Sequence, residues 1–172
     1  MAGCLFAVAV RAQQPPPLPM VHREAAHERL DFLIGQRVCN FEYIIRRARV
    51  PMAAEATGSW APGGVWLSRT FTYEAPELGA MWGQEMFAYE AGAQTWHRYV
   101  LDNQGHRVVS QTGGWNGEAL VFRGVQTNAR GQEVGFETRY TPRADGGYVV
   151  EYLNLARPEA PFNIGTETCE PA

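Results

Sequence analysis

The chain has 172 residues, of which 45% are hydrophobic, 12% aromatic and 19% charged, and this balance excludes a disordered chain, a coiled coil and a collagen-like repeat. Its length suits one domain with a substantial core. The formal net charge of −3 gives no basic excess for binding nucleic acid, and a sequence without lysine excludes Schiff-base and phosphate-loop lysine chemistry.

The first twenty residues are typical of an exported protein. A short apolar run, Cys4–Val10, precedes small residues that end at Ala12, as before a signal-peptide cleavage site. We interpret residues 1–12 as a truncated signal segment, residues 13–20 as a Gln/Pro-rich linker and residues 21–172 as a single barrel domain, periplasmic or secreted after cleavage near Ala12. A disordered apolar tail is the alternative. The run is too short to cross a bilayer, so we expect no membrane span.

One short helix is predicted over Val21–Ile34, because apolar residues recur there at helical spacing and Gly35 follows. Such a helix is expected to cover one end of the barrel. His22 and His27 fall on different faces of it, and we interpret both as solvated histidines rather than metal ligands.

The remainder is predicted to form about ten short strands, separated by turns rich in glycine, asparagine and aspartate. Strands in up-and-down order after one helix predict an all-β fold, a closed antiparallel barrel. The predicted strands are Val38–Ile45, Thr57–Trp60, Val65–Tyr73, Gln84–Tyr89, Thr95–Leu101, His106–Thr112, Ala119–Gln126, Glu133–Thr141, Tyr148–Leu155 and Gly165–Cys169.

Two cysteines are candidates for a disulfide. Cys39 lies in the first predicted strand and Cys169 in the last, and a closed barrel brings these strands side by side. In an oxidising compartment the pair can form a bridge, which would stabilise the fold by about 4–5 kcal/mol on the chain-entropy model. Two buried free thiols are the alternative.

Several short motifs occur together in the order of one known family: Leu30–Gly35 ahead of Cys39, Gly63–Leu67, Trp96 followed by Asp102–Gly105, Gly114–Gly124, and Thr166–Cys169. With them the chain resembles, over roughly Glu28 to Glu170, a family of bacterial lipocalin-like barrels that are often exported and are described as a domain of unknown function. The resemblance implies a calycin-type barrel with a central cavity and no established reaction. Such barrels commonly carry tryptophan where this chain has Arg37, so the closed end is expected to be packed differently or to be partly open.

The predicted hairpin Thr95–Thr112 carries two histidines. A tip within Asp102–Gly105 pairs Leu101 with His106 and places His97 about 13 Å from His106 along the ladder, too far to share one metal. His97 alone is a candidate haem ligand or general base, and the alternative is a hydrogen-bonded strand histidine. Asp102 is interpreted as a turn residue.

A second hairpin places an arginine among apolar residues. A turn centred near Ala129 and Arg130 sets Arg123 opposite the apolar face of Glu133–Thr141, pointing into the barrel. Arg69 has apolar neighbours on its own face in the same way. Two inward arginines indicate an anionic or polar-headed ligand with an apolar body. The alternative is that both extend outward or pair with Glu85 or Glu137.

The segment Glu74–Gly83 carries Leu78, Met81 and Trp82 and is predicted to be a loop, either a lid over the barrel mouth or a hydrophobic plug on the outside.

We expect the cavity to bind a small, largely apolar or amphipathic molecule, with no cofactor, metal or nucleic-acid partner; a homodimer is left open. A second hypothesis is a cofactor-independent lyase, isomerase or cyclase in which His97 or Glu137 moves a proton. A haem-binding barrel or a structural envelope barrel filled by its own side chains is the third. The expected ligand-binding residues are Trp60, Trp66, Arg69, Trp82, Trp96, Tyr99 and Arg123.

Overall fold

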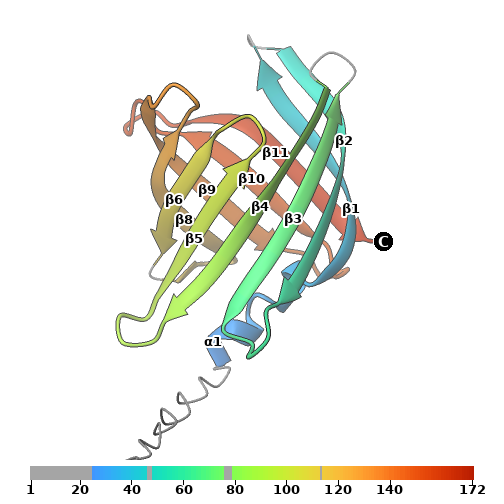
Figure 1. Cartoon of the computed structure of the whole chain (residues 1–172), viewed down its shortest axis with the longest axis vertical. Helices are drawn as coiled ribbons and strands as arrows, with labels where there is room; N and C mark the ends of the chain where they lie inside the picture. The colour runs from blue at the N-terminus through green and yellow to red at the C-terminus, as the bar shows by residue number, and fades with distance from the viewer. Residues whose placement is uncertain (1–24, 46–47, 76–78, 113) are drawn as a thin grey trace, which may run out of the picture.

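Ten antiparallel strands close into a barrel in the computed structural model of the chain, which describes residues 25–45, 48–75, 79–112 and 114–172. Figure 1 shows the barrel with the short helix α1 at its lower end. The predicted closed antiparallel barrel is therefore confirmed. The strands are β1 (Gly35–Ile45), β2 (Ala48–Trp60), β3 (Trp66–Ala75), β4 (Gly79–Glu90), β5 (Thr95–Asp102), β6 (Arg107–Thr112), β7 (Trp115–Asn116), β8 (Ala119–Thr127), β9 (Glu133–Pro142), β10 (Tyr148–Asn154) and β11 (Phe162–Pro171).

Strands next to each other in sequence are neighbours in the barrel, with two exceptions. The first is that β1 pairs with β11, which closes the barrel. The second is that β6 pairs with β8, and the two-residue strand β7 pairs with β8 beyond the end of β6. Gly124 makes the β6–β8 seam tight, because a Cβ atom there would lie 2.0 Å from the carbonyl oxygen of Val109. Among the described residues, the main wall of the barrel thus has no free strand edge.

The strands form where buried and exposed residues alternate, which is the period of a pleated strand. β2 alternates throughout, with Met52, Ala54 and Ala56 buried and the residues between them exposed. The prediction that this strand begins at Thr57 was wrong, because alanines carry little strand preference of their own. Tertiary pairing with β1, not local preference, extends β2 back to Ala48.

The described part of the predicted helix is shorter than expected. α1 (Ala25–Glu28) is followed by a 3-10 turn, η1 (Asp31–Leu33), and both end before β1 begins at Gly35. Residues 21–24 lie outside the described residues. Leu30 and Leu33 are fully buried and fill the lower end of the barrel, so this segment does cover one end. The helix breaks because packing two leucines into the barrel outweighs continued helical hydrogen bonding.

The prediction that His27 is solvated was wrong. The residue is 3% exposed, and its ring packs edge-on against Trp60, Tyr89 and Trp96. Burial follows from the short helix, which turns this face toward the barrel end. His22 lies outside the described residues.

Arg37 lies at the lower end of the barrel and holds it by hydrogen bonds. Its guanidinium donates to the carbonyl oxygens of Phe32 at 3.0 Å and Ile34 at 2.7 Å, and also to Gly146 at 3.2 Å. These bonds satisfy carbonyls at the end of the 3-10 turn and tie it to the β9–β10 loop. This one cation thus holds three backbone carbonyls together at the lower end.

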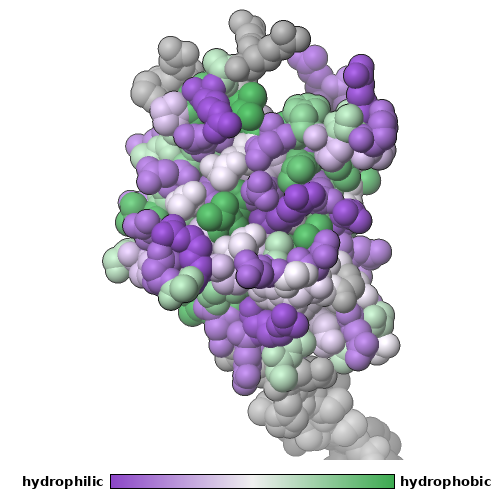
Figure 2. All heavy atoms as spheres, turned by 180° about the vertical axis from the view of Figure 1, so that it is seen from behind, coloured by the Kyte–Doolittle hydropathy of each residue, from purple (hydrophilic) through white to green (hydrophobic). Residues whose placement is uncertain are grey.

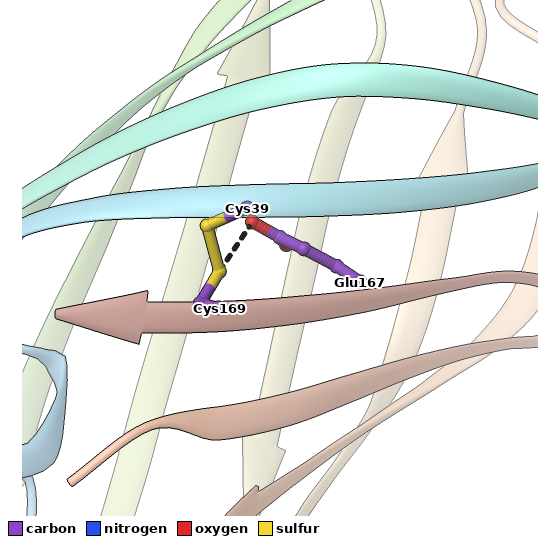
Figure 3. A group of neighbouring side chains, drawn as sticks. All are labelled: Cys39, Glu167 and Cys169. Carbon is purple, nitrogen blue, oxygen red and sulfur yellow. Dashed lines mark hydrogen bonds between the residues drawn. A yellow bond between two sulfur atoms is a disulfide. The ribbon is translucent and has the colours of Figure 1, made fainter. Parts of the chain in front are cut away.

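The two candidate cysteines are bonded. Cys39 and Cys169 are direct partners across β1 and β11, and their sulfur atoms lie 1.99 Å apart (Figure 3). The bridge joins the first and last strands of the barrel.

Hydrophilic side chains dominate the outer face seen from behind, with hydrophobic ones scattered among them (Figure 2). Large apolar residues therefore gather mainly inside the barrel, as alternation requires. No helix in the described ranges is long and apolar enough to cross a membrane.

Candidate ligand-binding cavity

A cavity of about 470 Å³ lies in the half of the barrel remote from α1. This volume is in the range of small-molecule sites. Gln104 is exposed and also lines the cavity, so the cavity reaches the surface beside the β5–β6 turn. Its wall is mostly apolar and aromatic, with Phe41, Met52, Phe71, Val100, Val108 and Phe136 among the lining residues.

Two glycines make room for the aromatic wall. A Cβ atom on Gly83 would lie 2.4 Å from the ring of Phe71, and one on Gly165 would lie 2.6 Å from the ring of Phe41. Each glycine lets a large ring lie flat against the neighbouring strand. The apolar surface offered to a ligand thus depends on two residues that have no side chain.

A buried network of two arginines and two glutamates lies at the floor of the cavity, which its members Glu85 and Arg98 line. Arg69 and Glu85 face each other across β3 and β4, and Arg69 Nη1 donates to Glu85 Oε2 at 2.9 Å. Arg69 Nη2 also donates to Glu167, and Arg98 Nη2 donates to Glu85 Oε1. All four side chains are at most 2% exposed. The charges alternate in the order Arg98, Glu85, Arg69, Glu167 and sum to zero.

Tyrosine hydroxyls complete the network. Tyr140 donates to Glu85 at 2.9 Å, and Tyr152 and Tyr73 donate to Glu167 Oε2 at 2.7 and 3.2 Å. Every oxygen of both carboxylates therefore accepts from at least one donor, which is the arrangement of an ionised carboxylate.

The disulfide touches this network. Figure 3 shows Glu167 beside the bridge, where its Oε1 lies 3.2 Å from Cys169 Sγ. The bonded sulfur has no proton to donate, so this is a contact and the donors to Glu167 are arginine and tyrosine. Because Cys39, Glu167 and Cys169 already have these partners, the geometry is that of a structural bridge rather than a metal site.

The electrostatics favour the charged forms of Glu85 and Arg98. Burial alone would raise the pKa of the Glu85 carboxyl, but the charges of Arg98 and Arg69 outweigh it and hold that pKa below its usual value. Burial opposes the charged form of Arg98 as well, yet Tyr140 and Glu85 beside it raise its pKa. Burial raises the pKa of Tyr148, whose hydroxyl accepts from Arg69 Nε, to about 12.

Arg98 keeps unused hydrogen-bonding capacity. Its side chain is 2% exposed and lines the cavity, and its Nε and Nη1 atoms have no hydrogen-bond partner in the described part of the protein. A buried donor without an acceptor is costly. Arg98 therefore brings N–H groups without an acceptor to the floor of the cavity that it lines.

The mouth carries an Asp–His pair. Asp102 Oδ1 accepts from the backbone N–H groups of Gln104 and His106, each at 2.9 Å, which is the turn role predicted for this residue. Its Oδ2 lies 3.0 Å from His106 Nδ1. Both residues line the cavity.

The predicted register of the first hairpin was wrong by one residue. Leu101 pairs with Arg107, not His106, and the inward residues of β5 are Trp96, Arg98 and Val100. His97 and Tyr99 consequently lie on the outer face, where His97 Nε2 lies 3.1 Å from Glu90. Neither lines the cavity as described, which removes the geometric support for His97 as haem ligand or general base there.

The second hairpin shows the same one-residue shift. Arg123 pairs with Glu137 across β8 and β9, so both occupy the outer face. Glu137 accepts from Arg123 Nε and Arg139 Nε, each at 2.6 Å. The prediction that Arg123 points inward was wrong. Glu137 lies on the same outer face and is not among the described residues that line the cavity. Arg123 pairs with Glu137, which was the alternative interpretation. Arg69 does point inward, and it pairs with Glu85.

The tryptophans do not form one site. Trp60 and Trp96 pack around His27 at the closed end and are not among the described residues that line the cavity, whereas Trp66 and Trp82 are 45% and 59% exposed. Trp82 and Met81 belong to strand β4 rather than to a loop, and Met81 alone of the two lines the cavity. The lid prediction is therefore wrong for these residues, and Leu78 lies outside the described ones.

Sequence reasoning missed Arg98, Glu85 and Glu167 as a group. Two of them carried a signal: Arg98 shares a strand face with Trp96 and Val100, and Glu167 shares one with Cys169. A charged residue that shares a strand face with buried residues is a candidate for a side chain that points into the barrel. What the pattern could not show is that the three meet.

Fold and cavity together define a closed antiparallel β-barrel with an apolar internal cavity that ends on a charged, hydrogen-bonded floor. The sequence matches no protein-family model, and no curated protein matches it significantly.

Proposed function

We propose that the protein binds a small, largely apolar molecule in the central cavity, with a polar group of that molecule against Arg98. The observation that carries the proposal is the buried Arg98 side chain at the floor of a 470 Å³ cavity, whose Nε and Nη1 have no partner among the described residues. Leaving such donors unpaired costs about 1–3 kcal/mol, and a ligand oxygen would recover it. Burial of the ligand body against the aromatic wall supplies the rest of the affinity.

We also propose a subcellular location for the protein. The N-terminal sequence pattern and the bonded Cys39–Cys169 pair support export to an oxidising compartment, as a lipocalin-like carrier in the periplasm or medium. Sequencing the N-terminus of the mature protein tests this, and cleavage near Ala12 is the expected result. The open volume at the mouth half favours a carrier over a structural barrel filled by its own side chains.

Native mass spectrometry tests binding directly. Protein purified from its own host should carry an adduct that is lost on denaturation. Val108→Trp should abolish the adduct, because Val108 is buried and lines the cavity. Val109→Trp is the matched control, since this neighbour on β6 is 54% exposed on the outer face and should leave the adduct intact. Equal adducts in both variants would contradict binding in this cavity.

The Asp102–His106 pair favours one second candidate, an enzyme that uses the same cavity. Arg98 would polarise a substrate oxygen and His106, oriented through Nδ1 by Asp102, would move a proton. Incubation with a panel of uncharged esters and ketones separates the two functions, because a carrier returns each compound unchanged. Loss of turnover in His106→Ala, with binding kept, would assign the reaction to this pair.

A further inference from the structure

Charge balance at the floor discriminates between an anionic and an uncharged ligand head group. Arg69, Arg98, Glu85 and Glu167 contribute two positive and two negative charges, all buried, and each charge has an opposite partner. The network therefore needs no counter-ion. Within the part of the chain that the structure describes, it lacks hydrogen-bond acceptors for Arg98 Nε and Nη1.

From this balance we infer that the cavity selects an uncharged molecule whose head group is a hydrogen-bond acceptor, such as the carbonyl oxygen of an ester or ketone, rather than a carboxylate. The inference rests on the proposed function and names the class of ligand. Arginine N–H groups can only donate, so the complementary group must accept. An uncharged oxygen meets that need and leaves the buried charge at zero.

A carboxylate would meet the same donors at a cost. It would be a third buried negative charge, held by the same guanidinium that already binds Glu85, and like charges at such a site oppose each other. The other carboxylic acid among the described residues that line the cavity is Asp102, which adds negative and not positive character at the mouth. Its partner His106 can at most balance it.

The test compares ligands with the same tail. Methyl decanoate, decanoate and decane compete with the uncharged dye N-phenylnaphthylamine for the wild-type protein near neutral pH. The ester should bind at least about tenfold more tightly than decanoate. Acidification toward the pKa of the fatty acid should raise the affinity for decanoate and leave that for the ester unchanged, because the protonated acid is also uncharged.

Two charge variants make the test specific. Glu85→Gln leaves the network with one excess positive charge, so decanoate should gain about tenfold relative to the ester. Glu137→Gln is the matched control: it also removes one glutamate that is buried and paired with two arginines, but on the outer face, and the ratio should not change. Should Glu85→Gln fail to fold, Arg98→Met serves instead, and it should abolish the advantage of the ester over decane.

The outcomes separate the two proposals. Dye binding with decanoate equal to or tighter than the ester, or an unchanged ratio in folded Glu85→Gln, would overturn the inference and leave binding in the cavity standing. A dye that does not bind, or that binds equally to wild type and Val108→Trp, would overturn the proposed function and the inference with it.

Discussion

Glu85 is the residue that holds the buried network together. It accepts from Arg69, Arg98 and Tyr140, so its loss leaves two guanidinium groups with one carboxylate between them. Breaking a buried ion pair by removing one partner typically costs about 3–5 kcal/mol. The low pKa of Glu85 also makes this contribution depend on pH.

Glu85→Gln should lower the free energy of unfolding by about 3–5 kcal/mol at neutral pH. Because the folded pKa lies below the unfolded one, the Glu85 contribution is present above the unfolded value of about 4.3 and is lost as pH falls through the folded value. The difference between wild type and variant should therefore shrink on acidification. Urea unfolding at a series of pH values measures it, with the exposed Glu159→Gln as control. A difference that stays constant into acid would contradict the assignment.

Among the elements, β1 and β11 form the seam between the two ends of the chain. The two strands lie far apart in the sequence and become neighbours because the barrel closes. The Cys39–Cys169 disulfide joins them across a separation of 130 residues. A long closed loop is where a disulfide restricts the unfolded chain most. The same bridge lies against Glu167 and so borders the cavity floor.

Removing the bridge should destabilise the barrel by up to about 5 kcal/mol on the chain-entropy model. Cys39→Ala combined with Cys169→Ala, unfolded in urea beside the oxidised wild type, measures the loss. The intact wild-type mass should be lower than that of its reduced form by two hydrogen atoms. A loss below about 1 kcal/mol would mean that strand pairing alone restricts this seam.

For the whole molecule, the interior is divided along the barrel axis. The half near α1 is filled by large side chains such as Phe87, Phe122 and Leu30, whereas the other half holds the cavity, and the charged network separates them. The filled half can stabilise the fold while the open half remains available to a ligand. This division requires a closed wall, which depends on the β6–β8 seam.

Gly124→Ala should weaken that closure. The added Cβ atom would lie 2.0 Å from the carbonyl oxygen of Val109 and 2.5 Å from Cα of Ser110, so backbone must move. We expect a loss of about 1–3 kcal/mol and faster amide hydrogen exchange in β6 and β8. Gly92→Ala, which meets nothing within 4 Å, is the control and should be nearly neutral. Unchanged exchange at the seam would show that closure does not depend on this glycine.

Turn residues and alternation were enough to predict most strands, but not which side of each strand faces inward. The turn after β8 was placed half a residue early, and the resulting shift of one residue exchanged the two faces of the hairpin. Arg123 thereby moved from the expected interior to the surface. The same error at the Asp102–His106 turn paired Leu101 with His106 instead of Arg107, and His97 with Ser110 instead of Gln111.

The sequence by itself determined the local pattern: a period of two in hydrophobicity, glycine- and asparagine-rich turns, and cysteines in the first and last strands, which together specify a closed antiparallel barrel. Only the tertiary structure decided the register of the hairpins and the meeting of Arg98, Glu85, Arg69 and Glu167. The physical reason is that alternation is a property of each strand alone, whereas register and closure depend on hydrogen bonds between strands and on burial summed over the whole barrel.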